Sequence, residues 1–248
     1  KTLLAAGTAS LGGARPKAAC EIDGHLFIAK FPHPTDRWDV MRWEHLALEL
    51  AEMAGITVPA HQLVEVEGSA VLLSRRFDRD ERGGRIGYIS AMTMLEADEG
   101  SSSDYLDIAD SLTELSIAAS EDLSQLYRRI LFSAFIHNTD DHLRNHGLVR
   151  HNAGWRLSPA FGLNPNPDLT RRHVTTIGGV NGDMTAEVQA LSHAREWFGL
   201  TEADARTISA EVAAALTQWR TQAQLSGITA GEIQLFAPVF NAGHKALK

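Results

Sequence analysis

The feature that most limits the fold of this chain is a polar stretch enclosed by apolar segments. Residues 136–145 contain two carboxylates, two imidazoles and two carboxamides. The flanking segments 131–136 and 148–149 are apolar, which predicts a buried element on either side. Buried polar groups cost free energy unless they have partners or a role, so we expect these side chains to line the floor of a cleft.

Asp140 and Asn145 within this stretch are five residues apart. This is the spacing of a kinase catalytic loop, in which the aspartate accepts the proton of the substrate hydroxyl and the asparagine oxygen holds a metal bound to the nucleotide phosphates. The alternative interpretation is a turn capped by Asx side chains, because Asp and Asn are common in loops. Other parts of a phosphoryl-transfer site are needed to decide between the two.

The composition narrows the class of protein. The chain has 248 residues, 44% of them hydrophobic and 22% charged, which is typical of a globular protein with one or two domains. A net charge of −8 argues against direct binding of nucleic acid, although it allows a DNA-binding partner. A single cysteine, Cys20, and the absence of an apolar run of about 18 residues predict a cytoplasmic protein without a membrane span. The chain enters motif-like sequence soon after Lys1, so we expect further residues to precede it.

The N-terminal part reads as a small antiparallel sheet with one helix. Residues 7–17 are small and glycine-rich, which would let backbone N–H groups approach phosphates; the alternative is an ordinary loop. Turn signals at 23–24 and 67–68 predict two hairpins. The strands expected on either side of these turns are 18–22, 25–31, 62–66 and 69–73.

Lys30 lies in an otherwise apolar strand, so its ammonium group must find a partner or reach solvent. Apolar spacing predicts a helix over 39–54 and places Glu44 at the margin of its apolar stripe. In kinases, a strand lysine paired with a carboxylate of the next helix is oriented onto the nucleotide phosphates. The alternative is that both side chains are ordinary surface groups.

The segment 74–79 leaves this sheet, and from about residue 90 the chain reads as mainly helical. The polar stretch is followed by two short predicted strands, 147–150 and 154–157, and then by a loop over 158–165. The predicted helices are 105–116, 123–136, 185–198, 202–222 and 230–240.

Six segments with kinase-like features stand in order along nearly the whole chain: 10–17, 29–32, the helix with Glu44, 76–79, 138–145 and 157–161. Together they closely resemble the HipA family of bacterial toxin kinases. The resemblance implies an α+β, two-lobed protein-kinase-like fold. The small antiparallel sheet lobe would span 1–79 and the larger helical lobe, with the catalytic and metal loops, would span 80–248.

The same resemblance implies a Ser/Thr protein kinase of the type II toxin–antitoxin class that uses ATP and Mg²⁺ inside a bacterial cell. Its expected partner is a small DNA-binding antitoxin. An aminoacyl-tRNA synthetase is the kind of protein such kinases phosphorylate.

For the nucleotide, the resemblance implies a site made by the glycine-rich loop and the strand lysine. Ser10, Gly12 and Gly13 would lie over the phosphates, Lys30 would bind them and Glu44 would orient the lysine. Ser10 also matches the serine that family members autophosphorylate to switch themselves off. A dianionic phosphate on this loop cannot share the space in which the nucleotide phosphates bind.

For catalysis, the resemblance makes Asp140 the base and Asn145 a Mg²⁺ ligand. The family has an aspartate, the second metal ligand, where this chain has Gly162. Glycine has no side-chain oxygen, so one anionic ligand of a hard cation is missing. Asp141 and Asp168 are the carboxylates considered as substitutes, although neither occupies the matching position.

Four functions are compatible with these residues. The first is a protein kinase toxin impaired at its metal site, and the second is a silent pseudokinase that acts as a binding scaffold, for which Gly162 is the main support. The third is a small-molecule phosphotransferase, because antibiotic phosphotransferases share the Asp-to-Asn spacing but not the loop over 10–17. The fourth, a metal phosphohydrolase built on His137, Asp140, Asp141 and His142, leaves the other motifs without a role.

Overall fold

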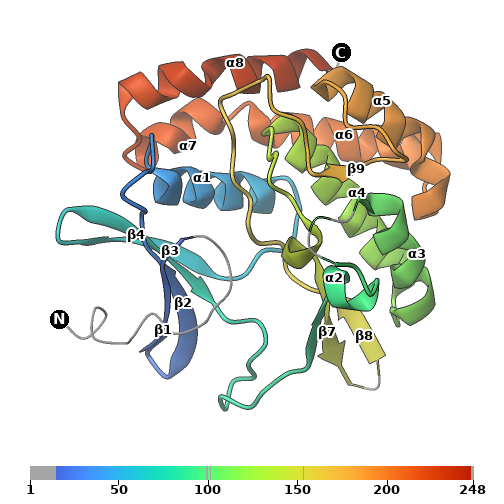
Figure 1. The fold of residues 1–248 in the computed structure, drawn as a ribbon, viewed down its shortest axis with the longest axis horizontal. Coiled ribbons are helices and arrows are strands. Elements are labelled where there is room, and N and C mark those ends of the chain that lie inside the picture. The colour runs from blue at the N-terminus through green and yellow to red at the C-terminus, as the bar shows by residue number, and fades with distance from the viewer. Residues whose placement is uncertain (1–14, 99, 101, 153, 247–248) are drawn as a thin grey trace.

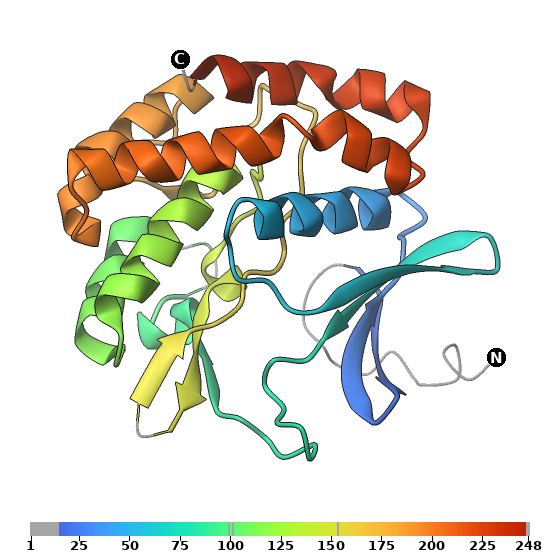
Figure 2. The same cartoon turned by 180° about the vertical axis from the view of Figure 1, so that it is seen from behind.

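The structure is a computed structural model that describes residues 15–98, 100, 102–152 and 154–246. Ser10, Gly12 and Gly13 of the predicted nucleotide loop lie outside these residues. A small sheet lobe and a larger helical lobe are joined by the segment that follows strand β4 (Figures 1 and 2). None of the described helices combines the length and the apolar character needed to cross a bilayer.

The sheet lobe is a four-stranded antiparallel sheet built from two hairpins. Its spatial order is β1 (Lys17–Ile22), β2 (His25–Lys30), β4 (Ser69–Arg75) and β3 (His61–Val66). Both central residues of each turn have positive φ: 50° and 80° in Asp23-Gly24, 51° and 78° in Glu67-Gly68. This geometry is that of type I′ turns, whose twist matches the twist of the strands, and it confirms the two predicted hairpins.

The helical lobe is organised around α4 (Ala119–Phe135), which packs against most of its other helices. Its other helices are α2 (Ala91–Met94), α3 (Tyr105–Leu115), α5 (Met184–His193), α6 (Glu202–Leu216), α7 (Trp219–Leu225) and α8 (Ala230–Ala246), with the 3-10 turns η1 (Leu143–Asn145) and η2 (Arg195–Phe198). Its strands are β5 (Tyr88–Ser90), β7 (Gly147–His151) and β8 (Gly154–Leu157) in one antiparallel sheet, and the parallel pair β6 (Ser103–Asp104) and β9 (Thr175–Thr176).

Helix α1 (Val40–Met53) lies between the sheet and the C-terminal helices (Figures 1 and 2). The Asp39 side chain caps its N-terminus. Trp43 is buried, and its ring stacks on Phe236 of α8 with 3.7 Å between the ring centroids. Glu232, also on α8, accepts hydrogen bonds from the Asp39 backbone at 3.1 Å and from the Trp43 indole at 3.2 Å. Helix α1 is therefore anchored to the last helix of the chain as well as to the sheet.

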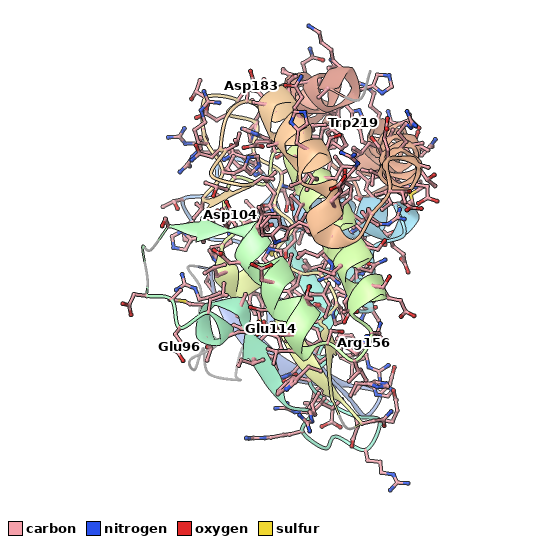
Figure 3. All side chains as sticks on the ribbon, turned by 90° about the vertical axis from the view of Figure 1, so that its right-hand side faces the viewer. Glu96, Asp104, Glu114, Arg156, Asp183 and Trp219 are labelled. Atoms are coloured by element: carbon pink, nitrogen blue, oxygen red, sulfur yellow. The ribbon has the colours of Figure 1, made fainter. Side chains whose placement is uncertain are left out.

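Asp104, labelled at the start of α3 in Figure 3, joins two distant segments. Its carboxylate caps α3 through the Leu106 backbone at 2.9 Å and accepts hydrogen bonds from the Thr176 hydroxyl at 2.6 Å and the Gly179 backbone at 2.7 Å. The parallel pair β6 and β9 is thus fixed by a side chain as well as by its backbone.

The prediction of one helix over 202–222 is wrong, because two helices, α6 and α7, occupy this range. At the break the Thr217 amide is shared between two carbonyls, and the Thr217 hydroxyl donates to the Ala214 carbonyl at 2.7 Å. Such local bonds compete with the regular helical ladder. After the break, Trp219 stacks on Phe240 of α8, with 4.4 Å between the ring centroids.

Candidate active site

The sheet lobe contributes an ion pair between Lys30 and Glu44. Lys30 is the last residue of β2, and Glu44 is buried on the neighbouring helix α1, where only 3% of its side chain is exposed. The lysine ammonium donates to Glu44 Oε1, so the predicted contact exists. Lys17 faces Lys30 across the β1–β2 ladder, and burial together with the charge of Lys30 lowers the pKa of Lys17. A bound anion would relieve the repulsion between these two cations.

The polar stretch follows the end of α4, where His137 adopts a φ of 55° and the chain turns into the loop. This loop separates its two adjacent aspartates: Asp140 is exposed, whereas Asp141 is buried with 2% of its surface accessible. The two carboxylates therefore work in different surroundings, and only the exposed one faces solvent from which a substrate could approach.

Asp141 is held by three side chains from different parts of the helical lobe. Its carboxylate accepts hydrogen bonds from the Tyr105 hydroxyl at 2.7 Å and the Ser133 hydroxyl at 3.2 Å, and it pairs with His146 Nε2 at 3.1 Å. Burial raises the pKa of Asp141, but the charge and hydrogen bond of His146 and the two hydroxyl donors outweigh burial and lower the pKa to about 2. Asp141 is thus a fixed anion that supports the loop beside Asp140.

The two positions that the resemblance assigns to metal ligands are neighbours. Gly162 has a φ of 72°, and a Cβ atom built on it would lie 2.9 Å from Oδ1 of Asn145. The buried side chain of Asn138 fixes this arrangement, because its Nδ2 donates to the Gly162 carbonyl at 3.2 Å and its Oδ1 accepts from the Asn164 backbone at 3.2 Å. A carboxylate at position 162 would therefore stand beside the Asn145 amide.

Both carboxylates considered as substitutes make other hydrogen bonds. Both oxygens of Asp141 already accept hydrogen bonds inside the protein. Asp168 uses Oδ1 within its own turn, where it accepts from the backbone and the hydroxyl of Thr170 at 3.0 and 2.6 Å. Of the two positions that the resemblance assigns to metal ligands, only Asn145 therefore offers a side-chain oxygen. A single amide oxygen is a poor site for a hard cation, which prefers several oxygen ligands including carboxylates.

The residues proposed for a metal phosphohydrolase do not form a shared ligand set. His137 Nε2 bonds to the Asp168 carbonyl at 3.0 Å, and the Asp141 carboxylate is occupied as described above. Within the described part of the chain, the only group of three His, Cys, Asp or Glu ligand atoms close enough to share a metal lies elsewhere, on α1 and β3. The geometry gives the phosphohydrolase alternative no support.

Sequence reasoning missed the residues beneath the loop. Arg129 on α4 is buried and donates to the Ser158 carbonyl at 2.6 Å, just before the loop that carries Gly162. Burial lowers its pKa to about 10, although Asp122 and Asp141 act in the opposite direction. A signal was available, because Arg129 and Ser133 lie four residues apart on one face of the helix, next to the apolar residues 130–132.

An aromatic cluster joins the segment between the lobes to the loop of Gly162. Phe77 follows β4, and its ring centroid lies 5.6 Å from that of Phe161 and 5.7 Å from that of Tyr88. Next to it, Arg76 and Asp78 form a two-point ion pair with hydrogen bonds of 2.8 and 2.6 Å. The crossing segment is thus packed directly against the residue that precedes Gly162.

Comparison with known proteins agrees with this arrangement. Residues 9–219 match the model of the HipA-like C-terminal domain. Among solved structures, HipA of Shewanella oneidensis MR-1, from a toxin–antitoxin complex with HipB and operator DNA, aligns with a TM-score of 0.69 and 15% identity over 97% of this chain and 64% of that chain. The Helicobacter pylori proinflammatory kinase CtkA aligns with a TM-score of 0.66 and 13% identity over 96% of this chain and 93% of that chain. No curated protein matches.

At these identities the solved structures establish the fold alone, and this chain spans 64% of the length of the HipA chain. The expected two-lobed, kinase-like α+β fold is confirmed. The family match covers far more than half of the residues. The chain therefore belongs to the HipA-like C-terminal domain family.

Proposed function

We propose that this chain is the kinase portion of a toxin–antitoxin protein that transfers phosphate from ATP to Ser or Thr, and that Gly162 impairs this transfer. The observation that carries the proposal is the contact between positions 145 and 162, five and 22 residues beyond the exposed Asp140. The side chain of Asn138 joins the two loops by two hydrogen bonds, which would hold the backbone of a two-ligand metal position in place even though one ligand is absent.

The remaining residues have complementary roles in this proposal. Lys30, oriented by Glu44, would bind the nucleotide phosphates, and Asp140 would accept the proton of the substrate hydroxyl. Mg²⁺ bound with the nucleotide would neutralise charge on the phosphates. Because the chain supplies only the Asn145 amide to such an ion, we expect nucleotide binding to be weakened less than phosphoryl transfer.

The first test restores the missing ligand with Gly162→Asp. Aspartate tolerates the left-handed backbone of this position better than most residues, and the flexible Asn145 amide can move from the new Cβ. We expect radiolabelled phosphate transfer from ATP to rise by at least about a hundredfold, the effect of adding one electrostatic stabiliser. Mass spectrometry should then find phosphate on Ser10 only in the Asp variant.

The matched control is Gly162→Ala, which adds the same Cβ without a carboxylate. Its activity should stay at the level of the unchanged chain. Equal activity of the Ala and Asp variants would contradict a metal-ligand role for position 162.

Gly162 also favours a second candidate, a pseudokinase that binds nucleotide or partner without catalysis. If the Asp variant binds ATP but labels neither itself nor any protein, this second function replaces the first. In both cases we propose a small DNA-binding antitoxin as partner, by analogy with the complex that contains the Shewanella HipA. A protein substrate such as an aminoacyl-tRNA synthetase and a bacterial cytoplasmic location complete the proposal.

A further inference from the structure

A second polar site lies on the other side of α1, away from the residues discussed above. A pocket of about 510 Å³ opens between α1, β3 and the turn that follows α7. The residues that matter in its lining are Arg42, His45, Glu49, His61 and Ser226. Two imidazoles and a carboxylate from two separate elements meet in this pocket.

Both imidazoles point the same ring atom at the same carboxylate oxygen. His61 Nε2 lies 3.0 Å from Glu49 Oε1, and His45 Nε2 lies 3.7 Å from it. One ligand atom from each of the three side chains lies within 4.8 Å of the others. Ligand atoms around a tetrahedral zinc with bonds of about 2.0–2.1 Å are roughly 3.3 Å apart, so small side-chain rotations would bring all three onto one ion.

The other ring nitrogens are already engaged, which orients the rings. His61 Nδ1 lies 2.9 Å from the Pro59 carbonyl, and because a carbonyl only accepts, this nitrogen carries the proton. His45 Nδ1 lies 3.3 Å from the Ser226 hydroxyl. In neutral His61 the Nε2 lone pair therefore faces a carboxylate oxygen, which is repulsive unless a cation lies between them. Metal-binding histidines are held in this way, with the non-ligating nitrogen bonded to a carbonyl or another polar group.

We infer that His45, Glu49 and His61 form a binding site for a divalent transition metal, with zinc as the ion whose preferred ligands and geometry match best. The set supplies two imidazole nitrogens and one carboxylate oxygen and leaves a fourth position open toward the pocket. Arg42 in the same pocket is paired with Asp39 and Glu65, so its charge is balanced by two other carboxylates.

Such an ion would act on the position of α1. His45 and Glu49 are one helical turn apart on α1, while His61 belongs to β3, so the metal would tie the helix to the edge strand of the sheet. Glu44, the partner of Lys30, directly precedes His45. Metal binding here would therefore restrict the helix that orients the lysine.

The test is a calorimetric titration of the chain, free of any histidine tag, with Zn²⁺. We expect about one ion per chain, and Co²⁺ in its place should give the visible absorption of a tetrahedral complex. The double variant His45→Gln, His61→Gln should lose at least about a hundredfold in zinc affinity, since even the loss of an outer partner of a ligand costs about 10–100-fold. Ser226→Ala should cause a smaller loss.

The matched control is His151→Gln with His193→Gln, which removes two exposed histidines and should leave zinc affinity unchanged. Circular dichroism in EDTA would show whether each variant folds, and Glu49→Gln serves as the test if the double variant does not. Two results would overturn the inference: no stoichiometric zinc binding, or equal zinc affinity in the unchanged chain and the site variants. Either result would favour a protonated histidine paired with Glu49.

Discussion

The sheet lobe holds a complete charged pair, Lys30 with the buried Glu44, whereas the position that we propose for a metal ligand in the helical lobe is Gly162, which has no carboxylate. The backbone around Gly162 is nevertheless held in place, because Asn138 bonds to residues on both sides of Leu163. The difference therefore concerns one side chain and not the folding of a loop. Under the proposed function, it would separate nucleotide binding, assigned to the first region, from phosphoryl transfer, assigned to the second.

The largest effect should come from Asp140 in the Gly162→Asp background. Adding Asp140→Asn should lower turnover by about 10²–10⁴ while ATP affinity changes little, because a base acts on the transition state. Steady-state kinetics would measure turnover, and calorimetry would measure ATP affinity. Asp168→Asn is the matched control, since Asp168 is exposed and bonded within its own turn. Retained activity in the Asp140 variant would assign the base to another group.

An intermediate effect should come from the sheet lobe. Lys30→Ala should weaken ATP binding by about 1–3 kcal/mol, the range of a charge-assisted hydrogen bond, even in the chain with Gly162. Calorimetry of both proteins measures this directly. Equal ATP affinities would mean that the pair of Lys30 and Glu44 stabilises the fold and does not hold the nucleotide.

An effect of similar size should be on stability, through Asp141. The pKa of Asp141 is about 2 in the folded protein, below its usual value, so its charge stabilises the fold above about pH 4 and this contribution is lost as the pH falls toward 2. The contribution is roughly 2 kcal/mol at neutral pH. The Asp141→Asn variant should thus have a lower free energy of unfolding than the unchanged chain at pH 7. This difference in unfolding free energy should shrink as the pH falls. A difference independent of pH, measured by urea unfolding, would contradict this account.

Sequence patterns correctly predicted the hairpins and helices whose formation depends on neighbouring residues. The turn at Asp23-Gly24 and the apolar spacing of α1 were sufficient to predict a hairpin and a helix, and the contact of Lys30 with Glu44 followed from their order. The environment of Asp141 was not predictable in this way, because Tyr105 reaches it from 36 residues earlier in the chain. Nothing in the loop itself indicates which of two adjacent aspartates is buried.

The shortest strands were missed for a related reason. Strands β6 and β9 have two residues each, too few for an alternating pattern, and they pair across 72 residues of sequence. The break between α6 and α7 was missed because Thr217 is compatible with a helix by propensity alone. It is the stacking of Trp219 on Phe240 that accompanies the break, and this contact depends on the packing of α8.

The hydrogen bonds from Asp39 and Trp43 to Glu232 have a consequence for the folding of this protein during its synthesis. They join residues 193 and 189 positions apart, so helix α1, although made early, completes its packing only after α8 has been made. A nascent or truncated chain without α8 could form its first hairpin, but helix α1, which carries Glu44, would lack its packing contacts with α8. Stable placement of the helix that carries the glutamate of the lysine–glutamate pair is thereby coupled to the synthesis of α8.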